Sequence, residues 1–101
     1  MRPKTVTVTS ANSPYYIPMD WRGGAFGVTA TPDSANYDVA YTTSNIAEGA
    51  AGIPSGEWTD ITDMSAATAA ASKEVGPSTC IRITLNSGTS VTVGVVQSDT
   101  Q

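Results

Sequence analysis

The sequence predicts an all-β fold: a single small antiparallel β-sandwich or barrel of about six to seven strands, with no substantial helix. Two observations lead to this prediction. Apolar and polar side chains alternate in several short segments, and a period of two is typical of strands with one buried face. Glycine, proline and asparagine separate these segments at intervals of roughly ten residues. The length of 101 residues corresponds to one domain.

Residues 79–97 carry the clearest pattern, because two alternating runs flank a turn signal at residues 86–88. We expect a hairpin with a three-residue loop, since that loop places Gly88 where left-handed backbone is needed. The same loop pairs Ile83 with Val91, so that apolar side chains share one face. The apolar residues of the two runs, which we expect in the core, are Ile81, Ile83, Leu85, Val91, Val93 and Val95.

A second hairpin is predicted from residues 25–31 and 36–43, which also alternate. The intervening residues 32–35 begin with Pro-Asp, a pair suited to the centre of a type I turn. A four-residue loop at this point pairs Val28 with Val39.

The chain ends are predicted to differ from the middle. Residues 1–13 are interpreted as an N-terminal arm or an edge strand, because their alternating part has only Val6 and Val8 as apolar anchors. An arm of this kind would add to the sheet of a neighbouring molecule. Residues 14–97 form the predicted β-sandwich domain, and residues 98–101 a polar tail.

The middle of the chain has weaker signals. Residues 44–56 are predicted to form a loop of small residues. Trp58 is out of phase with Ile61, which indicates a bulge or a short strand that ends near Thr59. Residues 64–72 are rich in alanine but lack a stripe of large apolar side chains, so we expect a flat connecting segment rather than a helix.

Charge and hydropathy limit the expected partners. The formal net charge is −4 and only 14% of the residues are charged, which argues against free nucleic acid or an anionic membrane as the main partner. No stretch approaches the ~20 apolar residues of a transmembrane helix, and no signal peptide is visible. A weakly charged, threonine-rich exterior favours a β protein that packs into an assembly.

Catalytic and metal-binding groups are sparse. Histidine is absent, so acid–base catalysis would depend on carboxylates alone. Glu57, Asp60 and Asp63 form the one acidic cluster, for which turn capping or solvation competes with a calcium site. Cys80, the single cysteine, is interpreted as a packing residue, and the glycines at 23–27 lack the lysine of a phosphate loop. We therefore expect no catalytic residue, no metal and no cofactor.

Aromatic residues gather in residues 15–22, where Tyr15, Tyr16 and Trp21 accompany Arg22. One interpretation is that they close one end of the core. The other is a protein contact, since Tyr, Trp and Arg are enriched at interface hot spots. A surface that stacks on sugar rings is a third alternative. The candidate interface residues are Val6, Val8, Tyr15, Tyr16, Trp21 and Arg22.

Three stretches resemble small β-sandwich structural proteins encoded among the head genes of tailed bacteriophages. They are residues 16–28 (YIPMDWRGGAFGV), residues 37–43 (YDVAYTT) followed by Trp58, and the strand residues within 80–97 (CIRITL, SGT, VTV and VQ). The resemblance implies a virion component without enzymatic activity, foremost a capsid decoration (cement) protein. The alternatives are a head–tail or tail accessory protein, or a glycan-binding β module.

The resemblance also implies partners and location. A decoration protein binds the major capsid protein and bridges neighbouring capsid subunits, here as a homo-oligomer (a dimer or a trimer) on the shell. It is made in the host cytoplasm and ends on the capsid surface of the virion. It needs no direct contact with nucleic acid or a membrane.

Overall fold

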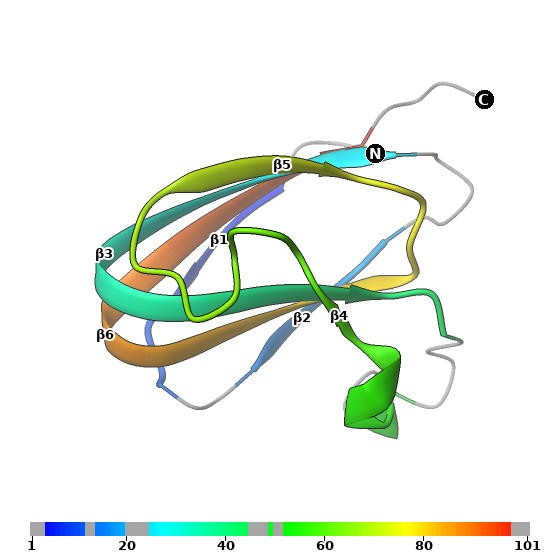
Figure 1. The fold of residues 1–101 in the computed structure, drawn as a ribbon, viewed down its shortest axis with the longest axis horizontal. Coiled ribbons are helices and arrows are strands. Elements are labelled where there is room, and N and C mark those ends of the chain that lie inside the picture. Colours follow the sequence, from blue (N-terminus) through cyan, green and yellow to red (C-terminus); the bar gives the residue numbers. More distant parts are fainter. Residues whose placement is uncertain (1–3, 12–13, 20–24, 45–48, 50–51, 98–101) are drawn as a thin grey trace.

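Two long strands, β3 (Phe26–Thr42) and β6 (Cys80–Gln97), form the centre of the fold (Figure 1). They run antiparallel and pair over their whole length, from Phe26 opposite Gln97 to Thr42 opposite Cys80. The structure is a computed structural model that describes residues 4–11, 14–19, 25–44, 49 and 52–97.

Four short strands complete a six-stranded antiparallel sheet. β1 (Lys4–Val8) and β2 (Tyr15–Pro18) pair with β6, whereas β4 (Thr59–Asp60) and β5 (Ala71–Val75) pair with β3. The described part of the chain contains the short 3₁₀ turn η3 (Ser55–Glu57) and no α-helix. The predicted antiparallel all-β fold without a substantial helix is thus confirmed, and the choice between sandwich and barrel stays a prediction. Among the described residues, no helix has the length and apolarity needed to span a membrane.

The sheet has two halves that share the long strands. The β1–β5 half consists of β1, residues 91–97 of β6, residues 26–32 of β3, and β5. The β2–β4 half consists of β2, residues 80–85 of β6, residues 37–42 of β3, and β4. Figure 1 shows both long strands curving sharply together at the left, so that one half turns back toward the other.

One hydrophobic core joins the two halves. Alternate side chains of each strand point to the same side of the sheet, and those on the inner side are buried. This confirms the core faces predicted from the period-two pattern for residues 26–30 and 81–95. The largest fully buried side chains are Tyr37, Phe26, Ile17, Met64, Ile81, Ile83, Leu85, Val28, Val39, Val91, Val93 and Val95.

The two predicted hairpins are wrong. The two arms of each predicted hairpin do not pair with each other; residues 32–35 and 86–88 lie within β3 and β6, where the two strands bend side by side. Ala35 lies opposite Gly88 at this bend. Because both strands bend at the same level, the ladder of hydrogen bonds between them continues through the bend. Each segment that was predicted to form two strands is therefore a single long strand.

The predicted pairings change accordingly. Ile83 pairs with Val39 and not with Val91, and Val28 pairs with Val95 and not with Val39. The alternation of side chains sets which face of a strand is buried, and it is the same in a hairpin and in a long bent strand. The predicted hairpins and the observed long strands therefore bury the same side chains, but their backbones have different hydrogen-bond partners.

A β-bulge and a polar network mark the bend. The register shifts between Asn36 and Tyr37, which leaves Asn86 as an extra residue on β6. The Asn86 side-chain amide donates hydrogen bonds to Asn36 Oδ1 at 2.9 Å and to Asp38 Oδ2 at 3.1 Å. The other oxygen of Asp38 accepts the backbone N–H of Ala66. This network links the bend to the segment that crosses beside it.

That crossing segment, residues 64–72, contains no helix in the structure, as predicted. Ala67 exchanges two backbone hydrogen bonds of 2.9 Å with Tyr37, whose hydroxyl donates to the Ala69 carbonyl at 2.8 Å. The fully buried Met64 anchors the start of the segment in the core. Ala67 and Ala71, which are partly buried, pack against the same core through their methyl groups.

Gly88 is required by the bend for two reasons. Its φ of +100° lies in the left-handed region, which L side chains rarely adopt. A Cβ atom on Gly88 would also lie 2.0 Å from the carbonyl oxygen of Ser34 on the neighbouring strand. The prediction of a left-handed glycine at this position is confirmed, although the turn is a strand bend and not a hairpin loop.

Replacing Gly88 by alanine should lower the free energy of unfolding by about 2–4 kcal/mol, because backbone strain and overpacking each cost about 1–3 kcal/mol. The matched control is Gly27→Ala, where a Cβ atom meets no atom within 4 Å. It should change stability by less than about 1 kcal/mol. Urea denaturation of both variants measures the difference. Equal stability of the two variants would contradict the role assigned to Gly88 in the stacked bends, that is, the bends of β3 and β6 that lie side by side.

Candidate protein interface

The outward side chains of the β1–β5 half form a polar surface with almost no charge, which we call the threonine face. Its side chains alternate along each strand with those buried in the core, so they point away from it. Most of its members are exposed, and Thr92 and Gly94 are half-buried. The threonine face consists of Thr5, Thr7, Gly27, Thr29, Thr31, Ser72, Glu74, Thr92, Gly94 and Val96.

The register of the sheet aligns these residues in rows across the strands. Hydroxyl groups of neighbouring strands are hydrogen-bonded: Thr7 Oγ1 lies 3.0 Å from Thr92 Oγ1, and Thr29 Oγ1 lies 3.2 Å from Ser72 Oγ. Cross-strand pairs of this kind stabilise a sheet and fix the side-chain rotamers. One row runs through Thr5, Gly94, Thr29 and Ser72, and the next through Thr7, Thr92 and Thr31.

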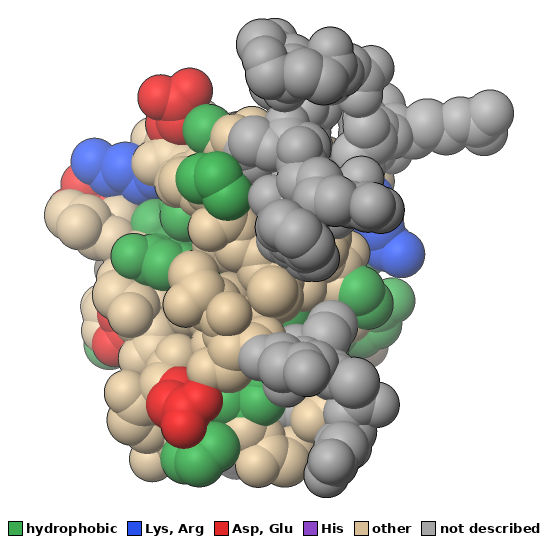
Figure 2. All heavy atoms as spheres, turned by 90° about the vertical axis from the view of Figure 1, so that its right-hand side faces the viewer, with side chains coloured by type: hydrophobic (Ala, Val, Ile, Leu, Met, Phe, Trp, Pro, Cys, Tyr) green, Lys and Arg blue, Asp and Glu red, His purple; other side chains and the backbone are tan. Residues whose placement is uncertain are grey.

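The chemistry of the threonine face suits coverage by another molecule. Glu74 is its single ionisable member, so covering the face removes few charges from water. Threonine presents a methyl group and a hydroxyl that both donates and accepts hydrogen bonds. Val96 adds apolar surface, since its side chain is 54% exposed. Figure 2 shows the side of the molecule that lies at the right in Figure 1, where uncharged polar side chains and backbone (tan) lie between hydrophobic side chains (green) and the acidic (red) and basic (blue) groups are few and separated.

The structure places the predicted interface residues Val6 and Val8 with their side chains toward the core. Val8 is 5% exposed, and the partly buried Val6 packs against the same cluster. Residues 4–8 form an edge strand of the chain's own sheet, paired with β6. The two valines therefore hold β1 in place, and a contact at this edge would use the backbone together with Thr5 and Thr7.

The predicted aromatic cluster is divided in the structure. Tyr15 and Tyr16 are neighbours on β2 and point to opposite sides of the sheet, since alternate residues of a strand do so. Tyr15 is 42% exposed, and Tyr16 is partly buried. Trp21 and Arg22 lie outside the described residues.

Tyr16 instead belongs to a second cluster, on the outer side of the β2–β4 half. Its ring lies 5.8 Å from that of Trp58, and the Arg82 guanidinium lies 4.8 Å from the Trp58 ring centroid. Ala40 and Cys80 form the buried floor. Trp58 is only 9% exposed, so its ring packs within the protein and is not an open platform for a sugar.

The predicted acidic cluster has separate local partners. Asp63 forms an ion pair with Lys73 at 2.9 Å, and Asp60 accepts a hydrogen bond from Ser65 at 3.3 Å. Glu57 accepts a hydrogen bond from the hydroxyl group of Ser44. In the described part of the chain, no three His, Cys, Asp or Glu side chains are placed to hold a metal ion.

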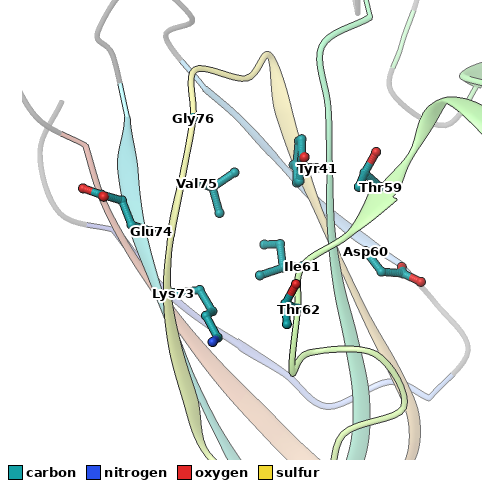
Figure 3. A pocket seen from close by; sticks show the side chains of 9 residues that line it. All are labelled: Tyr41, Thr59, Asp60, Ile61, Thr62, Lys73, Glu74, Val75 and Gly76. Atoms are coloured by element: carbon teal, nitrogen blue, oxygen red, sulfur yellow. The ribbon is translucent and has the colours of Figure 1, made fainter.

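A recess of about 440 Å³ lies between β5 and the chain at β4 (Figure 3). Ile61 and Val75 point toward one another across it, and both are buried. Asp60 and Glu74 point away from the recess, and Lys73 is held by its ion pair. The recess thus has an apolar floor without convergent polar groups among these lining residues, which does not suit a polar ligand.

Cys80 is fully buried, as expected of a packing residue. Burial raises the pKa of its thiol to about 11. The nucleophilic form of cysteine is the thiolate, so this thiol is unreactive near neutral pH.

The raised pKa of Cys80 should make stability fall with rising pH. The unfolded thiol loses its proton above its ordinary pKa of 9.0, whereas the folded thiol keeps it up to about 11. Between these values the folded state binds more protons, so the free energy of unfolding falls by up to about 1.4 kcal/mol per pH unit. Urea denaturation at about pH 8 and about pH 10 should show this loss. Cys80→Ala should lack the Cys80 part of it; parallel pH curves for both proteins would contradict the assignment.

No protein-family model, no curated protein and no solved structure matches the chain. We therefore argue its function from its residues and its fold.

Proposed function

We propose that this chain is a non-enzymatic structural protein of a tailed-bacteriophage virion, and specifically a capsid decoration protein. The threonine face is the observation that carries the proposal. It is a nearly uncharged surface on the outer side of the β1–β5 half, with its side chains aligned in rows across the strands. The short stretches that resemble phage head proteins give the proposal its biological setting.

A surface of this kind favours protein packing over a role in solution. Covering a charged group costs several kcal/mol unless a partner compensates it, whereas hydroxyl groups exchange water for new hydrogen bonds at a much smaller cost. The sheet fixes the backbone and the hydrogen-bonded threonine pairs fix several rotamers, so little conformational entropy is lost on binding. The partner in this proposal is the major capsid protein.

The mechanism is stabilisation by mass action. A protein that binds only the assembled lattice stabilises the lattice by its binding free energy. An oligomer, as a dimer or a trimer, engages more than one capsid subunit and gains avidity from the link between its sites. Many weak contacts repeated over a symmetric shell then add up to a large stabilisation.

A head–tail or tail accessory protein is the nearest alternative, since the same face would serve there. Copy number separates the two roles. Quantitative mass spectrometry of purified particles should find hundreds of copies for a decoration protein and only a few for a tail or neck component. Absence of the chain from purified particles would exclude both.

Arginine substitutions on the threonine face should reduce occupancy on particles. The double variant Thr29→Arg with Thr92→Arg buries two unpaired charges if this face is covered, so we expect at least about a tenfold loss of affinity, or about 1.4 kcal/mol. Binding of purified protein to particles that lack it gives the measurement.

The matched control is Thr62→Arg, an exposed threonine beside the recess and outside the threonine face. It should bind as the wild type does. Thermal unfolding should show that the double variant is folded. Full occupancy by a folded double variant would refute the assignment of this face to capsid binding.

A further inference from the structure

β1 forms one edge of the described sheet. β1 pairs with β6 along one side, and the described residues place no strand on its other side. An edge strand presents unpaired backbone N–H and C=O groups in a row, which can pair with another chain.

The other edges of the sheet carry features that oppose such pairing. β2 ends with Pro18, which lacks a backbone N–H. β5 carries the charged residues Lys73 and Glu74 in its centre, and β4 has only two residues. β1 has five residues, and its one charged residue, Lys4, is the first. Among the described edges, β1 is therefore the one best suited to accept a strand.

We propose that β1 pairs antiparallel with β1 of a second copy of this chain, around a twofold axis at Val6. Val6 then faces Val6 of the partner subunit, and Thr5 faces Thr7 of the partner subunit. Lys4 faces Val8 of the partner subunit. This inference concerns only the oligomeric part of the proposed function, and it names the contact.

The side chains on both faces of β1 agree with this pairing. Thr5 and Thr7 lie on the threonine face, and the new Thr5–Thr7 pairs repeat the hydrogen-bonded Thr7–Thr92 pair of the chain itself. Val6 is only partly buried at the sheet edge although it packs against the core. Val6 of the partner subunit would cover it and add apolar burial.

The charges also permit the pairing. The two copies of Lys4 lie four residues from each other along the strands, which is about 13 Å at 3.3 Å per residue. This separation exceeds the Debye length of about 8 Å at physiological ionic strength, so their repulsion is largely screened. The product is a continuous sheet with two threonine faces joined on one side. Such a dimer presents two binding surfaces at once.

The first test uses the purified chain alone and needs no particle, so its outcome is independent of the phage assignment. In the variant Thr5→Lys with Thr7→Lys, each new lysine directly faces another across the twofold axis, which disfavours pairing. Analytical ultracentrifugation should show a dimer for the wild type and at least about a tenfold weaker dimer for this variant. The control Thr29→Lys with Thr31→Lys adds the same charge to the same face on the central strand β3, and it should stay dimeric.

The second test traps the pairing covalently. Residues directly opposite in an antiparallel pair have Cα atoms about 4.5–5.5 Å apart, within the range of a disulfide. Mild oxidation of Val6→Cys should give a disulfide-linked dimer, whereas Thr31→Cys should stay uncrosslinked.

Three outcomes would overturn the proposal. A wild type that is monomeric at about 100 µM would do so, because pairing too weak to be seen there is not a specific dimer. A dimer that persists undiminished in Thr5→Lys with Thr7→Lys would assign the contact to another surface. Failure of a folded Val6→Cys to crosslink while the wild type is dimeric would refute this register.

Discussion

The stacked bends of β3 and β6 are the constraint on which the rest of this structure depends. Where Ala35 lies opposite Gly88, the two backbones approach so closely that no Cβ atom fits on the glycine. The bulge at Asn86 and its hydrogen bonds to Asn36 and Asp38 absorb the change of register beside this contact. One continuous ladder can therefore turn back on itself, and the inner side chains of both halves meet in one core.

The two outer faces of the bent sheet differ in their side chains. Trp58, Tyr16 and Arg82 cover part of the outer face of the β2–β4 half with a small cluster of their own. The outer face of the β1–β5 half carries threonine, serine and glycine, mostly exposed. Tyr16, one of the predicted interface residues, is thus packed within the fold. The threonine face is the better interface candidate.

The alternation in the sequence correctly predicted which face of each strand is buried, but it did not predict which strands pair with each other. Ile83 and Val91 were correctly assigned to the core, because burial follows a period of two in any strand. Their mutual pairing was wrong, because a glycine-containing turn signal marks a hairpin loop and a strand bend alike. The Trp58–Arg82 contact was missed because it joins distant segments across the outer face, which no local pattern records. The threonine face had a readable signal, since Thr5, Thr7, Thr29 and Thr31 all occupy the outward positions of alternating runs.

The bend also determines where growth of the sheet is possible. The strands at the margins of the described sheet are short, and each has its own chemistry. Proline on β2 and charges on β5 oppose the addition of a strand, whereas β1 keeps regular alternation from Lys4 to Val8. β1 is also the outermost strand of the threonine face, next to β6. A strand added there would extend the same ordered, uncharged surface, so in the proposed assembly the β1 edge and the threonine face form one interface with two directions of contact.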